Sequence, residues 1–348
     1  MRSLPYIPFG QALDGVSNVF VDGLRTHDTV LELSHWPGNR TPPDLKGDVS
    51  TQAALALLTT EDARRDALIG SARAVTCDHY DIDGILSLWC LVEPEKALRH
   101  RSVLEHTAIC GDFDVDTRDS AVQSCLALLA AEKSVQREIL SGPAAHSVER
   151  ATALLFEGML GLVEECLADP GGWAESWGEE WADINRSRAY LDSRPDAMEE
   201  FPELDLAVLH DTEVPLHDYV VNSRTDCFHV LRTRPDGRHS LRFRYESFVD
   251  LQTRTPGPRV RGDILADELN EGGDSGTWFC ESPATATPML LMYGEDAVPA
   301  PSALPPAAMA AIAVDFFARA RRQPALRWAS HAQWFTEAPI APPSKEQA

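Results

Sequence analysis

The amino-acid sequence predicts an α/β protein with a mostly parallel sheet flanked by helices, followed by a smaller, strand-rich α+β domain. Up to residue 209, short apolar runs that end in polar loops alternate with segments of helical periodicity, whereas alternating strand patterns dominate from residue 227 onward. With 348 residues, the chain is long enough for two domains. We expect a first domain over residues 1–213, a second over 214–335 and a disordered tail over 336–348.

The charge and the cysteines of the chain restrict its partners and its location. The formal net charge is −23, which argues against a long nucleic acid as partner. Arginines gather between Arg224 and Arg261, where the chain has nine of them and four acidic residues. The seven cysteines include no C-x-x-C pair, the N-terminus lacks an apolar signal region, and no apolar run reaches about 18 residues. We expect a cytoplasmic protein with no membrane segment.

The first two predicted strands, residues 16–23 and 28–34, are separated by a turn. The second strand runs into the block HWPGNRTPP, where the prolines exclude a helix. His35 and Arg40 in this loop are candidate functional residues if the strand is central. In the alternative, the loop is ordinary and a tryptophan packs beneath it. A helix over about residues 50–70 follows, because Asp48 and Ser50 supply candidates for its N-cap.

Residues 74–87, AVTCDHYDIDGILS, predict a buried strand, an acidic loop and a helix. Asp78, Asp81 and Asp83 lie within six residues together with His79, and such groups are costly to desolvate unless a cation lies among them. Loops beyond the carboxyl ends of strands bind ligands in open α/β sheets. Mn²⁺ and Mg²⁺ take oxygen ligands, and Mn²⁺ also accepts imidazole. We therefore expect one or two of these ions here. The alternative is an acidic turn that caps the helix and needs no metal.

The segment HTAIC, residues 106–110, predicts the next strand, which ends shortly before Asp112. A parallel sheet would bring Asp112 to the same edge as Asp81, so Asp112 is a further candidate ligand. In the alternative, Asp112 and the acids after it start the next helix, where they favour its dipole. Three helices are predicted over residues 118–140, 147–168 and 174–193. The last buried strand of the first domain, LDLAVL at 204–209, ends at His210.

The second domain is predicted to open with a hairpin of strands 227–233 and 238–245, joined by a Pro-Asp-Gly turn. Its arginines and the adjoining Tyr245 are candidates to bind an anionic substrate, since arginine suits bidentate recognition of phosphate or carboxylate. The candidates are Arg232, Arg242 and Arg244. In the alternative, these arginines pair with the acidic surface of the first domain. A helix over 263–270, strands over 277–281 and 288–293, and a helix over about 307–322 complete the prediction.

The block DHYDIDGILS resembles the first motif of the DHH phosphoesterase superfamily, whose members include exonucleases and oligonucleotide phosphatases. The resemblance implies a DHH-like fold and a pair of Mn²⁺ or Mg²⁺ ions. It implies Asp81 and Asp83 as ligands with Asp78 or His79 as a third, a bridging role for Asp112, and His210 in the place of the histidine ligands of that superfamily. Over most of its length, the chain also resembles an uncharacterised bacterial family with the blocks SHWPG, H-x-D-x-D-G and YES, here at residues 34–38, 79–84 and 245–247.

These observations predict a metal-dependent hydrolase, most simply a phosphoesterase acting on a small phosphorylated metabolite or nucleotide through a metal-activated water. Its catalytic candidates are His35, His79, Asp81 and Asp83. Two alternatives stay open because the chain contains no Asp-His-His triplet. One is a metal-dependent enzyme that cleaves an amide or ester bond; the other is a non-catalytic binding protein on a decayed DHH-like fold. A homodimer is also left open.

Overall fold

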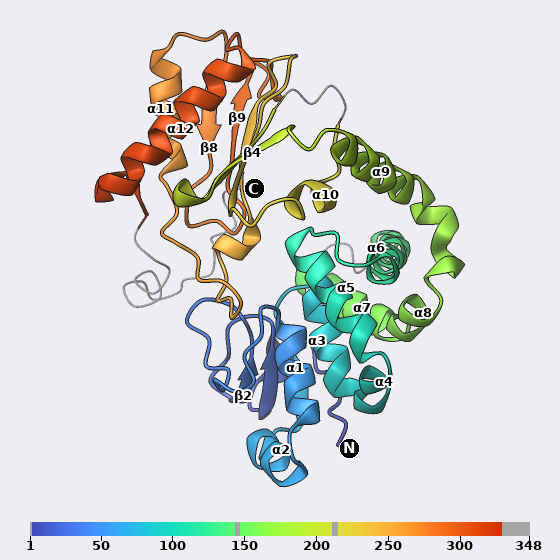
Figure 1. Ribbon diagram of the computed structural model, residues 1–348. Helices are drawn as coiled ribbons and strands as arrows, with labels where there is room; N and C mark the ends of the chain where they lie inside the picture. Colours follow the sequence, from blue (N-terminus) through green and yellow to red (C-terminus); the bar gives the residue numbers. More distant parts are fainter. Residues whose placement is uncertain (1, 143–146, 211–214, 329–348) are drawn as a thin grey trace. The chain divides into compact units, whose positions relative to one another are not determined.

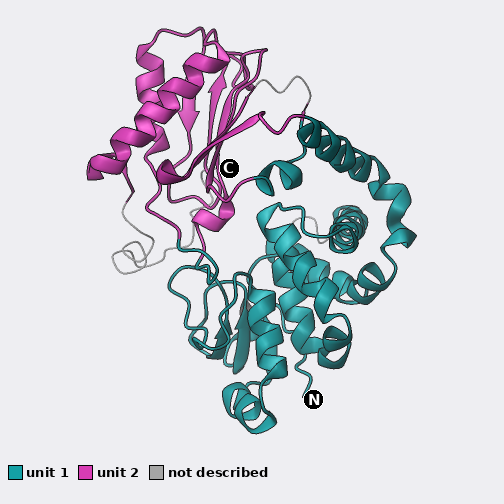
Figure 2. Cartoon of the chain, in the orientation of Figure 1, with its two compact units in different colours: residues 1–193, 216–224, 250–255 teal, residues 194–215, 225–249, 256–348 magenta. Residues whose placement is uncertain are grey.

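The computed structural model describes residues 2–142, 147–210 and 215–328, and it divides the chain into two compact units (Figure 2). The first unit comprises residues 1–193, 216–224 and 250–255, and the second comprises 194–215, 225–249 and 256–348. The predicted domain boundary between residues 213 and 214 and the predicted tail over 336–348 lie outside the described residues. The chain therefore passes repeatedly between the two units.

The first unit contains a parallel sheet of three strands among its described residues. The strands are β1 (Asn18–Val21), β2 (Thr29–Leu33) and β3 (Ala74–Thr76), in the order β2-β1-β3. Every residue of β1 and β3 is buried, as expected for a parallel sheet whose faces are both covered. Because the strands are parallel, their carboxyl ends meet at one edge, with β1 in the middle.

Helices make up most of the remainder of the first unit (Figure 1). The buried helix α3 packs between α1 and α5, and α5 in turn packs on the long helix α6. All residues from Ile82 to Leu91 are buried, which explains the continuous apolar run of α3. The helices are α1 (Ser50–Thr59), α2 (Asp62–Ile69), α3 (Ile82–Val92), α4 (Pro94–Arg99), α5 (Arg101–Phe113), α6 (Asp119–Leu140), α7 (Val148–Leu160), α8 (Val163–Ala168), α9 (Ala174–Ser193) and α10 (Asp218–Asn222).

Four sequence predictions about the elements are wrong. The single helix predicted over 147–168 is two helices, α7 and α8. Residues 106–110 belong to helix α5, because Leu104, Thr107 and Ala108 bury one face at helical spacing. A short apolar run fits a strand as well as a buried helix, and here tertiary packing decides. The single helix predicted over 50–70 is two helices, since Thr60 is extended with ψ 152°. The strand predicted as the last of the first domain, β5 (Leu206–Leu209), instead lies in the sheet of the second unit.

That second sheet has six described strands in the order β4-β5-β6-β7-β9-β8, and only β5 and β6 pair in parallel. The predicted hairpin is confirmed: β6 and β7 are antiparallel, and Gly237 in their turn has φ +77°. The remaining bounds are β4 (Met198–Phe201), β6 (His229–Arg232), β7 (Ser240–Phe243), β8 (Thr277–Cys280), β9 (Met289–Tyr293), α11 (Gly262–Glu271) and α12 (Pro306–Arg322), with short 3-10 turns at Gln11–Leu13, Pro170–Trp173, Pro202–Leu204, Tyr245–Ser247 and Pro324–Leu326.

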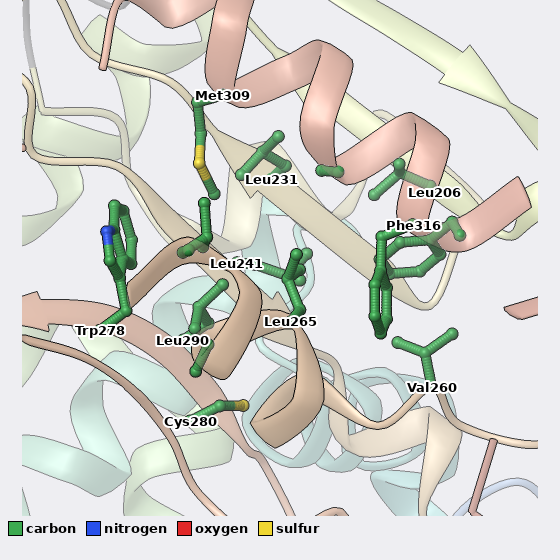
Figure 3. Packing of buried hydrophobic residues seen from close by; sticks show 14 of the residues in the cluster. Leu206, Leu231, Leu241, Val260, Leu265, Trp278, Cys280, Leu290, Met309 and Phe316 are labelled. Carbon is green, nitrogen blue, oxygen red and sulfur yellow. The ribbon is translucent and has the colours of Figure 1, made fainter. Parts of the chain in front are cut away.

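Helices α11 and α12 pack on the second sheet and close its hydrophobic core (Figure 3). Met309 and Phe316 of α12 and Leu265 of α11 meet alternate residues of the strands, such as Leu241 and Leu290. Buried residues alternate with partly buried ones along β7 and with exposed ones along β8, which is the period of two that a half-buried strand requires. None of the helices that the structure describes combines the length and hydropathy that a bilayer crossing needs.

Candidate metal centre

The carboxyl ends of the three strands in the first unit bring ligand-type side chains to one edge of the sheet. Asp22 follows the central strand β1, His35 follows β2 after one residue, and Cys77 and His79 follow β3. The backbone of Asp22 is left-handed, with φ 44°, a conformation that costs free energy in a residue other than glycine. The sheet order therefore places Asp22 between the two histidine-bearing loops.

His35 is buried and directs its Nε2 atom at three carboxylates. Its Nδ1 lies 2.5 Å from the carbonyl oxygen of Asp48, so Nδ1 carries the proton and donates it. Nε2 lies 3.4 Å from Asp22 Oδ1 and 3.9 Å from Asp83 Oδ2. It lies 3.7 Å from Asp112 Oδ2. A histidine whose far nitrogen donates to a carbonyl presents Nε2 in the orientation of a metal ligand.

His79 repeats this arrangement on the other side of Asp22. Its Nδ1 lies 2.8 Å from Asp78 Oδ1, while Nε2 lies 3.4 Å from Asp22 Oδ2 and 3.2 Å from Asp81 Oδ2. The ring packs against Trp36, with centroids 5.1 Å apart. Asp22 thus directs one oxygen towards each histidine, which is the geometry of a bridging carboxylate.

Two of the predicted ligands accept hydrogen bonds from backbone amides. Asp81 is the N-cap of α3, and its Oδ1 accepts from Gly84 N at 2.6 Å. Both oxygens of Asp83 accept from the N-terminus of α1, from Ser50 N at 2.6 Å and Thr51 N at 2.8 Å. The helix-capping alternative therefore accounts for part of the acidic cluster. A carboxylate oxygen that accepts one amide still has a lone pair for a cation.

Two other carboxylate oxygens have no such partner. Asp22 Oδ2 and Asp112 Oδ2 are buried and accept no hydrogen bond from the described residues. Ser50 Oγ donates to the other oxygen of Asp22 at 2.8 Å. Buried polar atoms are nearly always satisfied in folded proteins, so these two oxygens indicate a missing partner.

The proton affinities of the cluster show the cost of its buried charge. Burial raises the pKa of Asp83 to about 7 and holds the pKa of Asp112 well above its ordinary value. Burial alone would lower the pKa of His35, but the carboxylates of Asp112, Asp22 and Asp83 outweigh it and raise that pKa to about 10. Burial opposes ionisation of Asp22 as well, yet its contacts with His35 and His79 bring its pKa to about 2.

A divalent cation fits this cluster chemically and geometrically. The ligand atoms of Asp22, His35 and Asp83 lie within 4.8 Å of one another, as do those of Asp22, Cys77 and His79. Ligands about 2.1 Å from a shared ion lie roughly 3–4 Å apart, which matches the separations around His35 Nε2. Among the described residues, no lysine or arginine pairs with any carboxylate of the cluster. Five carboxylates thus face two imidazoles, and a negative charge remains even when both histidines are protonated.

Asp112 lies in the cluster although the strand predicted before it is a helix. It is in the last turn of α5, and its Oδ2 faces His35. His210 belongs to the second unit instead, where it pairs with Glu199 Oε2 at 3.3 Å. Arg40, on the loop after β2, is exposed and uses its backbone amide to donate to Glu32.

One of the hairpin arginines, Arg244, lies inside the second unit and not in an exposed anion-binding row. Arg244 is buried in the second unit, where it pairs with Glu246 and donates to the carbonyl of Thr225 at 2.8 Å. It is therefore a structural residue of that core. Arg232 lies opposite Ser240 across the strands, and Arg242 lies opposite Val230. Tyr245 begins a 3-10 turn and stacks on Phe248 with centroids 6.0 Å apart.

Sequence reasoning missed Asp22, the residue on which the cluster is centred, and Cys77. The available signal for Asp22 was an acidic residue directly after the apolar run VFV and before a glycine, the same pattern that marked Asp78 and its neighbours. This signal is weak, because a single aspartate in a turn is common. The order of the strands, which the sequence does not display, makes it central.

Comparison with known proteins identifies one family. A model of a family of unknown function, DUF6687, matches residues 2–328. No curated protein and no solved structure gives a significant match.

Proposed function

For this chain, which belongs to the DUF6687 family of unknown function, we propose a metal-dependent hydrolase that acts on a small phosphorylated substrate. One observation carries the proposal. The buried His35 Nε2 faces carboxylates of Asp22, Asp83 and Asp112. The Asp112 oxygen that it faces is buried and accepts no hydrogen bond from the described residues. A buried carboxylate in this position is tolerable when a cation shares it.

The residues that would hold the ion are Asp22, His35, Asp83 and Asp112. Their oxygen-rich set with one imidazole suits Mn²⁺, and Mg²⁺ also takes the oxygens. A divalent ion supplies a polarised scissile group and a bound water with a pKa near neutrality. The carbonyl of Asp48 fixes the tautomer of His35. Asp81, whose side chain is 36% exposed, would accept a proton from the attacking water.

A small phosphoester is the substrate class that best fits the chain. The resemblance of DHYDIDGILS to the first DHH motif supports phosphoester chemistry, and the net charge of −23 opposes binding of a long polyanion. The exposed Arg40 on the loop that carries His35 supports recruitment of a compact anion. An amide or ester substrate is the alternative, because the later DHH motif is missing.

A non-catalytic role is favoured by a different observation, the backbone amides that satisfy Asp83 and cap α3 through Asp81. In that case an imidazolium at His35 would offset part of the negative charge of the cluster and no ion would bind. Metal content separates the two functions directly.

The first test measures bound metal and activity in the Asp22→Asn variant. We expect the full chain to bind Mn²⁺ stoichiometrically and to hydrolyse p-nitrophenyl phosphate or a bis-phosphate ester. Asp22→Asn should lose the metal and at least about 100-fold in rate, because it removes the shared ligand. Asp28→Asn, in the turn after the same strand, is the control and should change neither quantity.

The substrate panel distinguishes the remaining alternatives. Hydrolysis of carboxyl esters or amides without any turnover of phosphoesters would replace the proposed substrate class. A folded protein that binds no Mn²⁺ and cleaves none of these compounds would support the non-catalytic role instead.

A further inference from the structure

Cys77 lies among the side chains of the candidate metal centre but has no part in the proposed hydrolysis. It directly follows β3 and is 1% exposed. Its Sγ lies 3.0 Å from the carbonyl oxygen of His79 and 3.3 Å from that of Asp22, so the single S–H of the thiol has two carbonyl acceptors within reach. All seven cysteines are buried, but among the described residues only Cys77 has its sulfur grouped with other ligand atoms, those of Asp22 and His79.

Two of these ligand atoms, those of Cys77 and Asp22, also lie close together beside Gly84. A Cβ on Gly84 would lie 3.3 Å from Cys77 Sγ, 3.4 Å from Asp22 Oδ2 and 3.1 Å from Asp81 Oδ1. Gly84 has an ordinary helical backbone, so no left-handed conformation calls for glycine here. Glycine thus adds no side chain at a point where ligand-type atoms from two segments meet, the turn after β1 and the loop between β3 and α3.

A second observation points to a ligand in this space. Asp22 is fully buried, and its Oδ2 accepts no hydrogen bond from the described residues while facing His79 Nε2 at 3.4 Å. The other nitrogen of His79 is held by Asp78 at 2.8 Å, a carboxylate–histidine pair that orients metal-binding imidazoles. The sulfur, the imidazole and the orphaned oxygen together form a ligand set distinct from the one around His35.

We propose that Asp22 Oδ2, Cys77 Sγ and His79 Nε2 form a sulfur-containing cation site that selects Fe²⁺, Co²⁺ or Zn²⁺ over Mg²⁺. Thiolate and imidazole suit borderline transition metals, whereas Mg²⁺ requires oxygen ligands. On binding, the Cys77 S–H proton passes to solvent and a sulfur–metal bond replaces it, so charge and atoms balance. The inference rests on the proposed function only in that Asp22 is shared with the ion at His35.

The test uses the full chain after removal of metal with a chelator, titrated anaerobically with Co²⁺. A thiolate ligand gives a sulfur-to-cobalt charge-transfer band in the near ultraviolet. We expect this band to saturate at one equivalent, to be displaced by Zn²⁺, and to survive a large excess of Mg²⁺.

Two variants assign the band. Cys77→Ser should abolish it while the ion at His35 still binds, and the affinity for Zn²⁺ should fall at least about tenfold. Cys90→Ser is the matched control, because Cys90 is equally buried, in α3, and belongs to no group of ligand atoms among the described residues. A band that persists in Cys77→Ser, or wild-type protein that binds Co²⁺ without a band, overturns the proposal.

X-ray absorption of the zinc-loaded wild-type protein keeps the proposal testable if Cys77→Ser does not fold. One sulfur scatterer at about 2.3 Å supports the site, and a shell of nitrogen and oxygen alone refutes it. Failure here is distinguishable from failure of the proposed function. A sulfur-ligated metal with no hydrolysis of any ester leaves this site standing, whereas Mn²⁺-dependent hydrolysis without sulfur ligation removes it and leaves the hydrolase.

Discussion

Asp22 shows that a single residue can be central to a candidate site that its neighbouring sequence does not predict. Its backbone is in the left-handed region, its carboxylate is fully buried, and its two oxygens face His35 and His79. Ser50 Oγ donates a hydrogen bond to Asp22 Oδ1 at 2.8 Å, so this oxygen has a partner. Strain and incomplete satisfaction at one residue are the features that functional sites commonly retain.

The shifted pKa values of His35, Asp83 and Asp22 predict how the stability of the protein depends on pH when no metal is bound. The pKa of His35 is raised from 6.5 to about 10, so the stability it contributes is complete below pH 6.5 and is lost as pH rises towards 10. The pKa of Asp83 is raised from 3.8 to about 7, so its contribution is likewise lost as pH rises from 3.8 to 7. The opposite shift, the lowered pKa of Asp22 at about 2, acts only in strong acid.

We therefore expect the melting temperature of the chelator-treated protein to fall between pH 6 and pH 9. The increase in melting temperature on adding Mn²⁺ should grow over the same range, because metal binding requires deprotonated ligands. Thermal melts with and without Mn²⁺ at several pH values measure both. An increment that shrinks with rising pH would contradict ligation by His35 and Asp83.

At the scale of elements, helix α5 positions Asp112 through its contact with α3. A Cβ on Gly111 would lie 2.5 Å from Ile82 Cβ and 2.8 Å from its Cγ1, so the two helices touch where glycine has no side chain. This close packing places the last turn of α5 beside the start of α3, which carries Asp83. The cluster of ligand-type side chains thus depends on helix packing as well as on strand ends.

Gly111→Ala is expected to destabilise the protein by about 1–3 kcal/mol, because the new methyl group must push α5 away from α3. Gly178→Ala in α9 is the control: nothing lies within 4 Å of its added Cβ, and alanine there should stabilise the helix by up to about 1 kcal/mol. Urea unfolding measures both changes. Equal effects of the two substitutions would show that the α3–α5 contact does not constrain the helices.

At the scale of the whole molecule, the first unit is completed by two late segments of the chain. Residues 216–224 supply Asn222, whose Nδ2 donates to the carbonyl of Asp114 at 3.1 Å at the end of α5. Residues 250–255 supply the amides of Gln252 and Thr253, which donate to Asp48 Oδ1. Asp48 is also the residue whose carbonyl orients His35.

A fragment of residues 1–193 is therefore expected not to fold cooperatively, even though it contains every residue proposed to bind metal. It lacks the buried Tyr219 and Val221 of α10 and the segment that holds Asp48. Circular dichroism melts of the fragment and of the full chain provide the comparison. A cooperative transition of the fragment at the temperature of the full chain would contradict this dependence.

The sequence alone determined much of the local structure and part of the chemistry. Apolar runs and turn residues predicted β1, β2, β3 and the β6–β7 hairpin correctly, because these patterns reflect local steric and burial preferences. The crowded acids around His79 were also evident, since they lie close in sequence. The sequence also offered an acidic turn that caps the helix as the alternative to a metal site, and Asp81 caps α3 in the structure.

Only the tertiary structure decided which distant residues meet. The parallel order β2-β1-β3 brings Asp22 and His35 to the edge where His79 lies, and α5 adds Asp112 as a helix instead of a strand. The tertiary structure also places β5 in the second sheet, with His210 directly after it, and buries Arg244 beside Glu246. Strand order and helix packing follow from the burial of apolar surface across the entire chain. Because this free-energy balance is global, neither can be read from the residues at any single position.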